Sequence, residues 1–208
     1  LPISALTQTP ETPYEDPTGF YRSAENYGKC EVILYSPQHT IKFYELSVDH
    51  IVKLLNLVAD RCTELSKDPK IQYVFPFENK GEAVGVTMPH PHGQLYGYSF
   101  VPQKIVTELD SAKAYYEEAG ECLLCAMNKA ESDAGLRIVA ENDSFLAYIP
   151  FFTDYPYGVF VVAKRHIGML SECTAAERRD LAKILKALTK GFDDLFQKPF
   201  PYMMVYHQ

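Results

Sequence analysis

The chain has 208 residues, 47% hydrophobic and 23% charged, which is the composition of an ordinary globular protein with room for one large domain or two small ones. No run approaches the roughly 18 to 20 apolar residues of a membrane-spanning helix, and no export leader opens the sequence, so we expect no membrane partner. The net charge of −7 argues against nucleic acid as a partner.

Cysteine usage indicates a reducing compartment. The five cysteines are Cys30, Cys62, Cys122, Cys125 and Cys173. An odd number with one Cys-x-x-Cys pair is not typical of a disulfide framework, so we expect a cytoplasmic protein. The chain begins without methionine and ends at Gln208, just after a strand-like run, so we expect further segments at both ends.

The first half is predicted to contain an arm and a strand–helix–strand unit. Residues 5–29 are rich in Pro, Thr and Glu, which predicts an extended arm. Apolar runs predict strands at residues 31–35 and 71–77. The helix between them has apolar residues at the spacing of one helical face: Ile51, Leu54, Leu55, Val58, Cys62 and Leu65.

A turn-like stretch at residues 78–81 leads towards the run Pro89-His-Pro-His-Gly-Gln94. Alternate side chains of an extended segment share a face, so His90, His92 and Gln94 should point the same way. The proline between the histidines favours extended backbone, and the glycine lets a ligand approach closely. A neutral imidazole attacks phosphorus when its other ring nitrogen is protonated and held, which makes His92 the candidate nucleophile. The alternative is a surface loop in which these histidines have no role.

The second half repeats the first. Residues 103–119 predict a connecting helix, followed by a strand at 159–163, a second long helix and a strand at 201–206. The apolar positions of that helix have the offsets found in the first copy: Leu181, Ile184, Leu185, Leu188, Phe192 and Leu195. Thr174 and Glu177 have the spacing of a capping box at its start.

Identical offsets, with a histidine after the first strand of each copy (His39 and His166), indicate an internal duplication. Strand–loop–helix–strand units also resemble one another by chance, and that alternative stays open. We predict an α+β fold of two units, residues 1–102 and a truncated 103–208, each an antiparallel sheet with packed helices.

The segment Phe77-Glu-Asn-Lys-Gly81, the His-Pro-His-Gly-Gln run, Ser99-Phe100 and Pro102 closely resemble the galactose-1-phosphate uridylyltransferase family of the histidine-triad superfamily. Further matches are Ser36-Pro-Gln-His39, Glu45-Leu-Ser47, Asp193-Asp-Leu-Phe196, Phe200-Pro-Tyr202 and His207. The resemblance covers nearly the whole chain from residue 20 onward, and it implies two histidine-triad-like units.

The resemblance implies a double displacement. His92 attacks the α-phosphorus of UDP-glucose, glucose-1-phosphate leaves, and the uridylyl-histidine passes UMP to galactose-1-phosphate. It also implies that the backbone carbonyl of His90 orients the nucleophile and that Gln94 stabilises the α-phosphate oxygens. By the same resemblance, Asn79 and Thr87 contribute to the phosphate site.

Gln94 favours a transferase over a hydrolase. Histidine-triad hydrolases have a histidine at this position, whereas a glutamine cannot act as an acid or a base, which suits an intermediate that waits for a sugar phosphate. Lys80 is a further candidate for binding phosphate, on chemical grounds alone.

The resemblance implies a first metal site of zinc, bound by a cysteine pair and by the histidines at positions His39 and His90. No cysteine pair precedes these histidines in the chain, and we expect a Cys-x-x-Cys upstream of Leu1. The alternative for His39 is a strand-end residue that binds no metal.

A second metal site is predicted at Cys122 and Cys125, because their spacing lets both thiolates bind one tetrahedral zinc ion. By the repeat, their partner is His166. Other family members lack this cysteine pair and hold iron with a glutamate and histidines, and Glu108 and His207 align with two of those ligands. Two inert buried cysteines are the remaining alternative.

Three function classes stay open. The first is UDP-glucose–hexose-1-phosphate uridylyltransferase, an enzyme of galactose metabolism that pairs as a homodimer in this family. The second is an ADP-sugar phosphorylase or another histidine-triad nucleotidyltransferase that uses the same histidine. The third is a non-catalytic metal-binding fragment.

Overall fold

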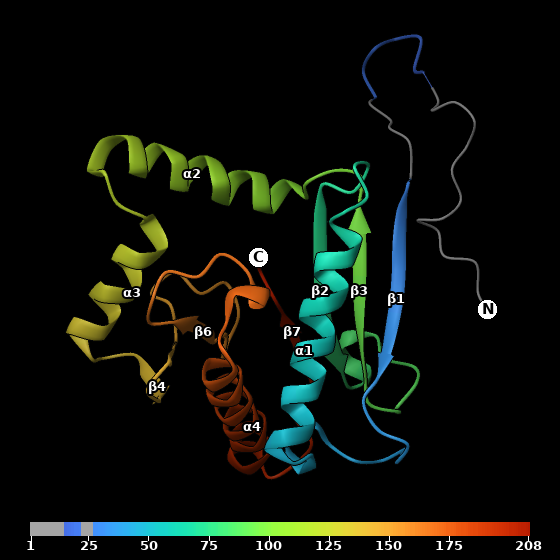
Figure 1. The fold of residues 1–208 in the computed structure, drawn as a ribbon, viewed down its shortest axis with the longest axis vertical. Coiled ribbons are helices and arrows are strands. Elements are labelled where there is room, and N and C mark those ends of the chain that lie inside the picture. The colour runs from blue at the N-terminus through green and yellow to red at the C-terminus, as the bar shows by residue number, and fades with distance from the viewer. Residues whose placement is uncertain (1–14, 22–26) are drawn as a thin grey trace. The chain divides into compact units, whose positions relative to one another are not determined.

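The computed structural model describes residues 15–21 and 27–208 (Figure 1). Of the predicted arm, residues 5–14 and 22–26 lie outside the described residues, and residues 28 and 29 belong to the first strand instead. In the described part of the arm, the carboxylate of Asp16 accepts hydrogen bonds from the backbone N–H groups of Thr18, Phe20 and Tyr21. These bonds form an Asx-type turn.

The helices and strands follow one another as β1 (Gly28–Leu34), α1 (Val48–Leu65), β2 (Tyr73–Lys80), β3 (His92–Tyr98), α2 (Gln103–Ala119), α3 (Leu123–Ala134), β4 (Ile138–Glu141), β5 (Phe145–Tyr148), β6 (Phe160–Ala163), α4 (Ala175–Phe196) and β7 (Tyr202–Val205). Short 3₁₀ turns lie at Phe43–Glu45, Glu82–Val84 and Leu170–Glu172. Within the described ranges, no helix is both long enough and apolar enough to cross a lipid bilayer.

The chain divides into two compact units. The first consists of Leu1–Thr40, Val58–Pro102 and Pro201–Gln208, and the second of Ile41–Leu57 and Gln103–Phe200. The chain passes from the first unit to the second between residues 102 and 103. The start of α1 belongs to the second unit although it lies in the first half of the chain, and the last strand belongs to the first unit although it lies in the second half.

The first unit contains an antiparallel sheet of order β1-β3-β2-β7. Along β3 the side chains alternate, so that Gly93 and Leu95 are buried while His92 and Gln94 are half-buried. The register places Gln94 between Val32 of β1 and Phe77 of β2. One face of the sheet is therefore closed and the other is more open. The His-Pro-His-Gly-Gln run contributes to the open face.

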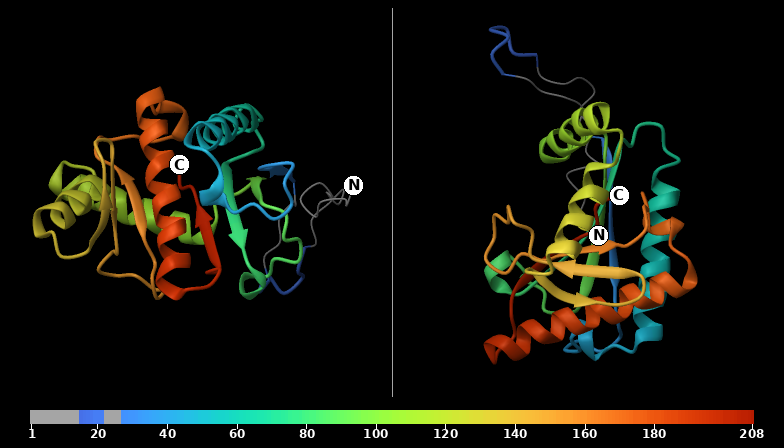
Figure 2. Two further views of the ribbon diagram at one scale, coloured as in Figure 1. Left: turned by 90° about the horizontal axis from the view of Figure 1, so that it is seen from below. Right: turned by 90° about the vertical axis from the view of Figure 1, so that its left-hand side faces the viewer.

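The second unit contains an antiparallel sheet of order β4-β5-β6, with every residue of β5 buried. Helix α4 lies against β5 and β4 (Figure 2). The Asp193 carboxylate of α4 is buried and accepts hydrogen bonds from Lys42, Tyr44 and the backbone N–H of Phe200. The free-energy cost of burying this carboxylate is offset by the charge of Lys42 and by the two other hydrogen-bond donors.

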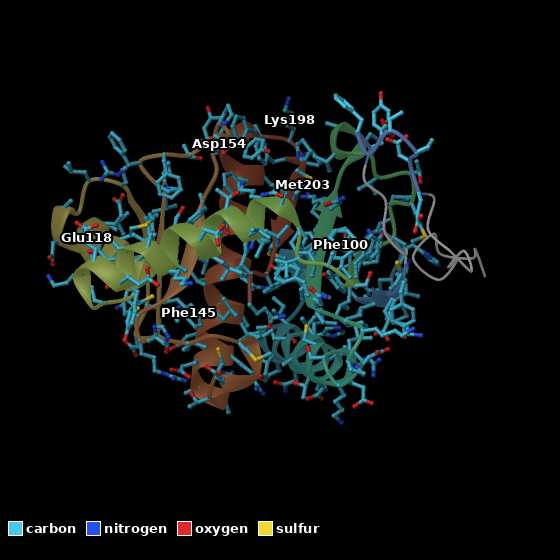
Figure 3. The ribbon with its side chains drawn as sticks, turned by 90° about the horizontal axis from the view of Figure 1, so that it is seen from above. Phe100, Glu118, Phe145, Asp154, Lys198 and Met203 are labelled. Carbon is cyan, nitrogen blue, oxygen red and sulfur yellow. The ribbon has the colours of Figure 1, made fainter. Side chains whose placement is uncertain are left out.

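The predicted α+β fold with antiparallel sheets is confirmed, and each copy has a strand, a 3₁₀ turn, a long helix and a strand in this order. The connecting helix at residues 103–119 and the capping box of Thr174 and Glu177 are also confirmed. Helix α2 carries Glu118, which is labelled in Figure 3, and none of the residues of this helix is buried.

Three local predictions differ from the structure, and three elements were not predicted. Residues 78–80 belong to β2 and not to a turn, which begins at Gly81. The last strand, β7, pairs with β2 in the sheet of the first unit. Leu195 is 64% exposed, because the last turns of α4 direct Phe192 and Phe196 onto the ring of Phe200. The short helix α3 and the strands β4 and β5 have no counterpart among the predictions.

Candidate functional site

His92 opens β3, opposite Leu34 of β1. Its Nδ1 atom lies 2.8 Å from the backbone carbonyl oxygen of His90. The tautomer that donates this hydrogen bond carries its proton on Nδ1 and leaves the lone pair on Nε2. This is the contact that the resemblance implies for a nucleophilic histidine.

Gln94 lies two residues along the same strand and therefore on the same face as His92. Its Oε1 accepts a hydrogen bond from the hydroxyl of Tyr96 at 3.2 Å. The oxygen of Gln94 thus accepts from Tyr96, and its NH₂ group is the part that can donate to a phosphate oxygen.

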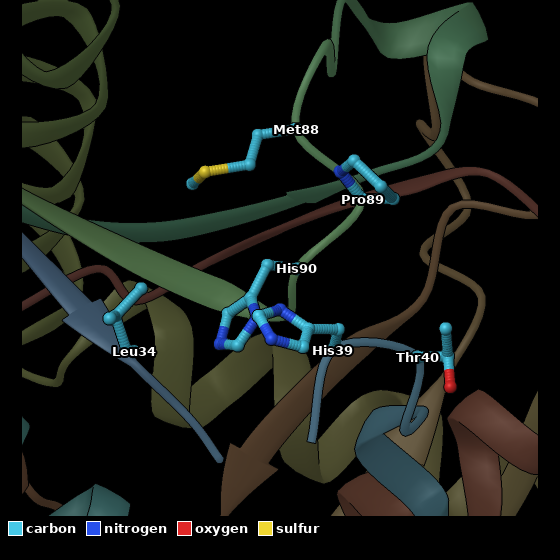
Figure 4. A pocket seen from close by; sticks show the side chains of 6 residues that line it. All are labelled: Leu34, His39, Thr40, Met88, Pro89 and His90. Atoms are coloured by element: carbon cyan, nitrogen blue, oxygen red, sulfur yellow. The ribbon is translucent and has the colours of Figure 1, made fainter. Parts of the chain in front are cut away.

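His90 precedes β3, so the strict alternation holds for His92 and Gln94 only, and the ring of His90 faces His39. The two Nδ1 atoms lie 3.0 Å apart, with the ring planes inclined by 72°. Figure 4 shows both rings at the wall of a pocket of about 430 Å³, lined otherwise by Leu34, Thr40, Met88 and Pro89.

The geometry of this histidine pair fits one metal ion. Two nitrogen ligands of a tetrahedral zinc ion, each about 2.0–2.1 Å from the metal, lie about 3.3 Å from each other. The observed separation of 3.0 Å between the Nδ1 atoms of His39 and His90 is close to that value. The Nε2 atom of His90 is buried and has no hydrogen-bond partner among the described residues.

The candidate phosphate residues are placed differently from one another. Asn79 follows Phe77 by two residues in β2, which puts it on the sheet face of Gln94 and His92. Lys80 lies on the opposite face, and its ammonium nitrogen lies 5.3 Å from the centre of the Tyr202 ring. The structure therefore does not bring Lys80 to His92, because strand pleating turns it away.

Thr87 is exposed in the connection between the 3₁₀ turn at Glu82–Val84 and β3. Gly85 ends that turn with φ of 84°, a left-handed conformation that glycine adopts without strain. This turn sets the path by which the connection containing Thr87 leads into the His-Pro-His run.

Glu78 is a buried acid to which the sequence analysis assigned no role. It is 4% exposed, and its Oε1 accepts a hydrogen bond from the Tyr202 hydroxyl at 2.6 Å. Burial raises the pKa of Glu78 to about 7, and hydrogen bonds from Tyr202 and Tyr35 oppose this shift. The signal that could have found it is the alternation of β2, once that strand is extended to Lys80.

Cys122, Cys125 and His166 come together in the second unit, with their ligand atoms all within 4.8 Å of one another. Cys122 immediately precedes α3 and Cys125 lies in its first turn, while the Nδ1 of His166 lies 3.2 Å from the Cys125 sulfur. Burial and the neighbouring Cys122 thiol raise the pKa of Cys125. Two adjacent thiolates are therefore unfavourable unless a cation binds them, which is the chemistry of a zinc site.

The alternative iron ligands belong to different units. Glu108 is an exposed residue of α2 in the second unit, whereas His207 follows β7 in the first unit and its ring lies 6.2 Å from that of Phe75. Among the described residues, the group that could hold a metal with three ligands consists of Cys122, Cys125 and His166.

Comparison with known proteins matches both halves of the chain. Residues 4–102 match the family model described as the N-terminal domain of galactose-1-phosphate uridyl transferase, and residues 108–208 match that of its C-terminal domain. A curated relative, the galactose-1-phosphate uridylyltransferase of Thermotoga maritima, is 37% identical over 190 residues, which are 91% of this chain and 59% of the relative.

Two solved structures are similar over most of the chain. A uridylyltransferase has a TM-score of 0.89 and 32% sequence identity, and the match covers 97% of this chain and 63% of that one. An ADP-glucose phosphorylase from Arabidopsis thaliana with bound ADP-glucose has a TM-score of 0.81 and 26% identity, with coverage of 88% and 57%. The chain thus spans less than two thirds of the length of these relatives.

Proposed function

The chain belongs to the galactose-1-phosphate uridyl transferase family, and we propose that it transfers UMP from UDP-glucose to galactose-1-phosphate through a uridylyl-histidine. The observation that carries this proposal is the contact between the Nδ1 of His92 and the carbonyl of His90. Because Nδ1 is held by that carbonyl, the lone pair that would attack a substrate is the one on Nε2.

In the first step the Nε2 of His92 forms a bond to the α-phosphorus, and the bond from that phosphorus to the oxygen of glucose-1-phosphate breaks. The imidazole becomes cationic, and the His90 carbonyl stabilises the proton that remains on Nδ1. The amide NH₂ of Gln94 donates to a phosphate oxygen, with Asn79 as a second donor on the same sheet face. In the second step a phosphate oxygen of galactose-1-phosphate displaces the imidazole, which returns to its neutral form.

The test uses UDP-glucose labelled in the α-phosphate. We expect the protein to acquire label that is labile to acid and stable to base, as a phosphoramidate is, and the His92→Asn variant to acquire none. His50→Asn, in helix α1, is the matched control and should label like the unmodified protein. Label that persists in His92→Asn would contradict the assignment of the nucleophile.

A second candidate function, ADP-sugar phosphorylase, is favoured by the likeness to the Arabidopsis enzyme. Repeating the test with labelled ADP-glucose decides the base: stronger labelling than with UDP-glucose would favour the phosphorylase. No label from either nucleotide sugar would instead support a metal-binding fragment without catalysis.

We propose zinc at two places. His39 and His90 would hold the first ion, and Cys122, Cys125 and His166 the second, where a zinc ion would tie the start of α3 to the end of β6. Iron on Glu108 and His207 is the alternative for the second site. Bound zinc supplies charge and rigidity at these positions, and no step of the transfer involves it.

Metal analysis of the purified protein tests the second site. We expect Cys122→Ser to lose about one equivalent of zinc relative to the unmodified chain, because removing one of the tetrahedral ligands weakens binding strongly. Cys30→Ser, which changes a half-buried cysteine in β1, should retain the full content. Equal zinc in both variants, or loss of iron in Glu108→Gln, would contradict the cysteine site.

We also propose a homodimer in the cytoplasm. Its support is that none of the five cysteines forms a disulfide bond and that the open face of the first sheet carries exposed apolar side chains, at Val32, Leu34, Met203 and Val205. Light scattering should give twice the mass of one chain, and a monomer that persists at high concentration would contradict the dimer.

A further inference from the structure

Behind the strand that carries His92 lies a buried group of polar side chains. Glu78 of β2 accepts a hydrogen bond from Tyr202 of β7, and the hydroxyl of Tyr35 also interacts with this carboxyl. Tyr35 is 7% exposed and Glu78 is 4% exposed. A buried carboxyl is unfavourable unless its hydrogen bonds offset the loss of water, so this group needs an explanation beyond packing.

Tyr35 contacts both neighbours of His92 in the chain. Its backbone N–H donates to the carbonyl oxygen of Pro91 at 3.0 Å. Its ring and hydroxyl lie directly beneath Gly93, where a Cβ atom would overlap the Tyr35 hydroxyl and come within 3.1 Å of two ring carbons. The absence of a side chain at Gly93 is therefore required by Tyr35, on the closed face of the sheet.

Resting on the proposed role of His92 as nucleophile, we propose that Glu78 is a positioning residue for it: the buried carboxyl holds the Tyr35 hydroxyl, and Tyr35 in turn supports Pro91 and Gly93 on either side of the nucleophile. Glu78 itself does not touch the reacting atoms, because it lies on the opposite face of the sheet. Its effect is to keep the backbone of residues 90–93 in the geometry that places the His90 carbonyl against the Nδ1 of His92.

The expected effect on the rate of labelling of His92 is large enough to measure. A displacement of about 1 Å in a reacting group can slow an enzymatic step about 100-fold. We expect Glu78→Leu, which removes the acceptor at similar volume, and Tyr35→Phe, which removes only the hydroxyl, to slow labelling of His92 by about tenfold or more. Glu78→Gln keeps one acceptor oxygen and should restore most of the rate.

Matched controls separate positioning from general loss of stability. Tyr148→Phe removes a buried tyrosine hydroxyl that donates to Asn128 in the second unit, and Glu131→Leu removes a buried acid that pairs with Arg137. These two variants lose buried hydrogen bonds of the same kinds, and neither changes the first sheet. We expect both to label at the rate of the unmodified chain.

A second readout does not depend on turnover. In protein with ¹⁵N-labelled histidine, the two ring nitrogens of His92 give separate signals for the protonated and the unprotonated atom, and His92→Asn identifies them. We expect Tyr35→Phe and Glu78→Leu to move these two signals towards each other, as the Nδ1–H tautomer is held less firmly, and the controls to leave them unchanged.

If the His92 ring signals of Tyr35→Phe coincide with those of the unmodified chain, the proposal is overturned. This holds even if Glu78→Leu does not fold. Label absent from the unmodified protein would contradict the transfer function, while the ring signals would still decide the positioning role. Normal labelling of the unmodified protein with unchanged ring signals in the variants would leave the transfer function standing and remove the role of Glu78.

Discussion

At the scale of single residues, His92 and Glu78 occupy opposite faces of one antiparallel sheet, and each face gives its residue a different chemistry. His92 is half-buried and oriented by a backbone carbonyl, which leaves one ring nitrogen available to a substrate. Glu78 is enclosed and bonded to tyrosine hydroxyls, which suits a structural acid more than a reacting one. The pleat of the strands separates the two roles.

The burial of Glu78 predicts a dependence of stability on pH. Its pKa is raised from an ordinary 4.5 to about 7, so the folded chain binds this proton more tightly than the unfolded chain does. Protonation therefore stabilises the fold, and the contribution declines as the pH rises from about 4.5 through about 7. Relative to Glu78→Gln, which cannot ionise, the free energy of unfolding should fall by up to about 3 kcal/mol across this window.

Urea denaturation of the unmodified chain and of Glu78→Gln, at about pH 5 and about pH 8, measures this difference. Comparison with the variant removes the contributions of the histidines and of other groups that titrate in the same range. A difference that is the same at both pH values would show that the carboxyl does not titrate between them.

At the scale of elements, the two long helices have the same apolar offsets and different ends. In α1 the face predicted from Ile51 to Leu65 is buried at its last position, whereas α4 turns Leu195 to the surface. The difference arises from the aromatic stack of Phe192 and Phe196 on Phe200, which defines the inner side of the last turns of α4. Periodicity predicts a helical face, and local partners decide where that face ends.

The start of α4 supplies a prediction of its own. The Thr174 hydroxyl accepts from the backbone N–H of Glu177, and the Glu177 carboxylate accepts from the backbone N–H of Thr174. Thr174→Ala should lower the free energy of unfolding by about 1 kcal/mol, because one N–H group of the first turn loses its acceptor. Chemical denaturation measures this change.

Ser111→Ala, on the exposed helix α2, is the matched control for Thr174→Ala. It also removes a hydroxyl from a helix, but the hydroxyl is inside the helix and donates back to the carbonyl of Thr107. We expect a change close to zero, since alanine is the better helix former. Equal losses in the two variants would argue against a contribution from the capping box.

At the scale of the whole molecule, the last strand returns to the sheet of the first unit. Strand β7 pairs with β2 from Phe77 to Lys80, the part of β2 that carries Glu78 and Asn79. The candidate active-site sheet is therefore completed by residues that follow the second unit in the chain. Both halves of the sequence contribute to one sheet.

Deleting residues 201–208 should weaken this sheet. We expect the amides of β2 between Phe77 and Lys80 to lose protection in hydrogen exchange, because they lose their partner strand, while the amides of α4 remain protected. Met203→Lys, a change at an exposed position of β7, should keep the pairing and the protection. Unchanged protection of β2 in the deletion variant would contradict the pairing.

The sequence by itself determined the periodic and local features of this protein. The long helices, the capping box at Thr174, the His-Pro-His-Gly-Gln run and the Cys-x-x-Cys pair all depend on residues close together in the chain, where spacing alone carries the signal. The tertiary structure decided which strand β7 pairs with, that Lys80 turns away from His92, and that Glu78 is enclosed beneath Tyr35. Strand pairing and burial arise from contacts between residues far apart in sequence, which no local pattern specifies.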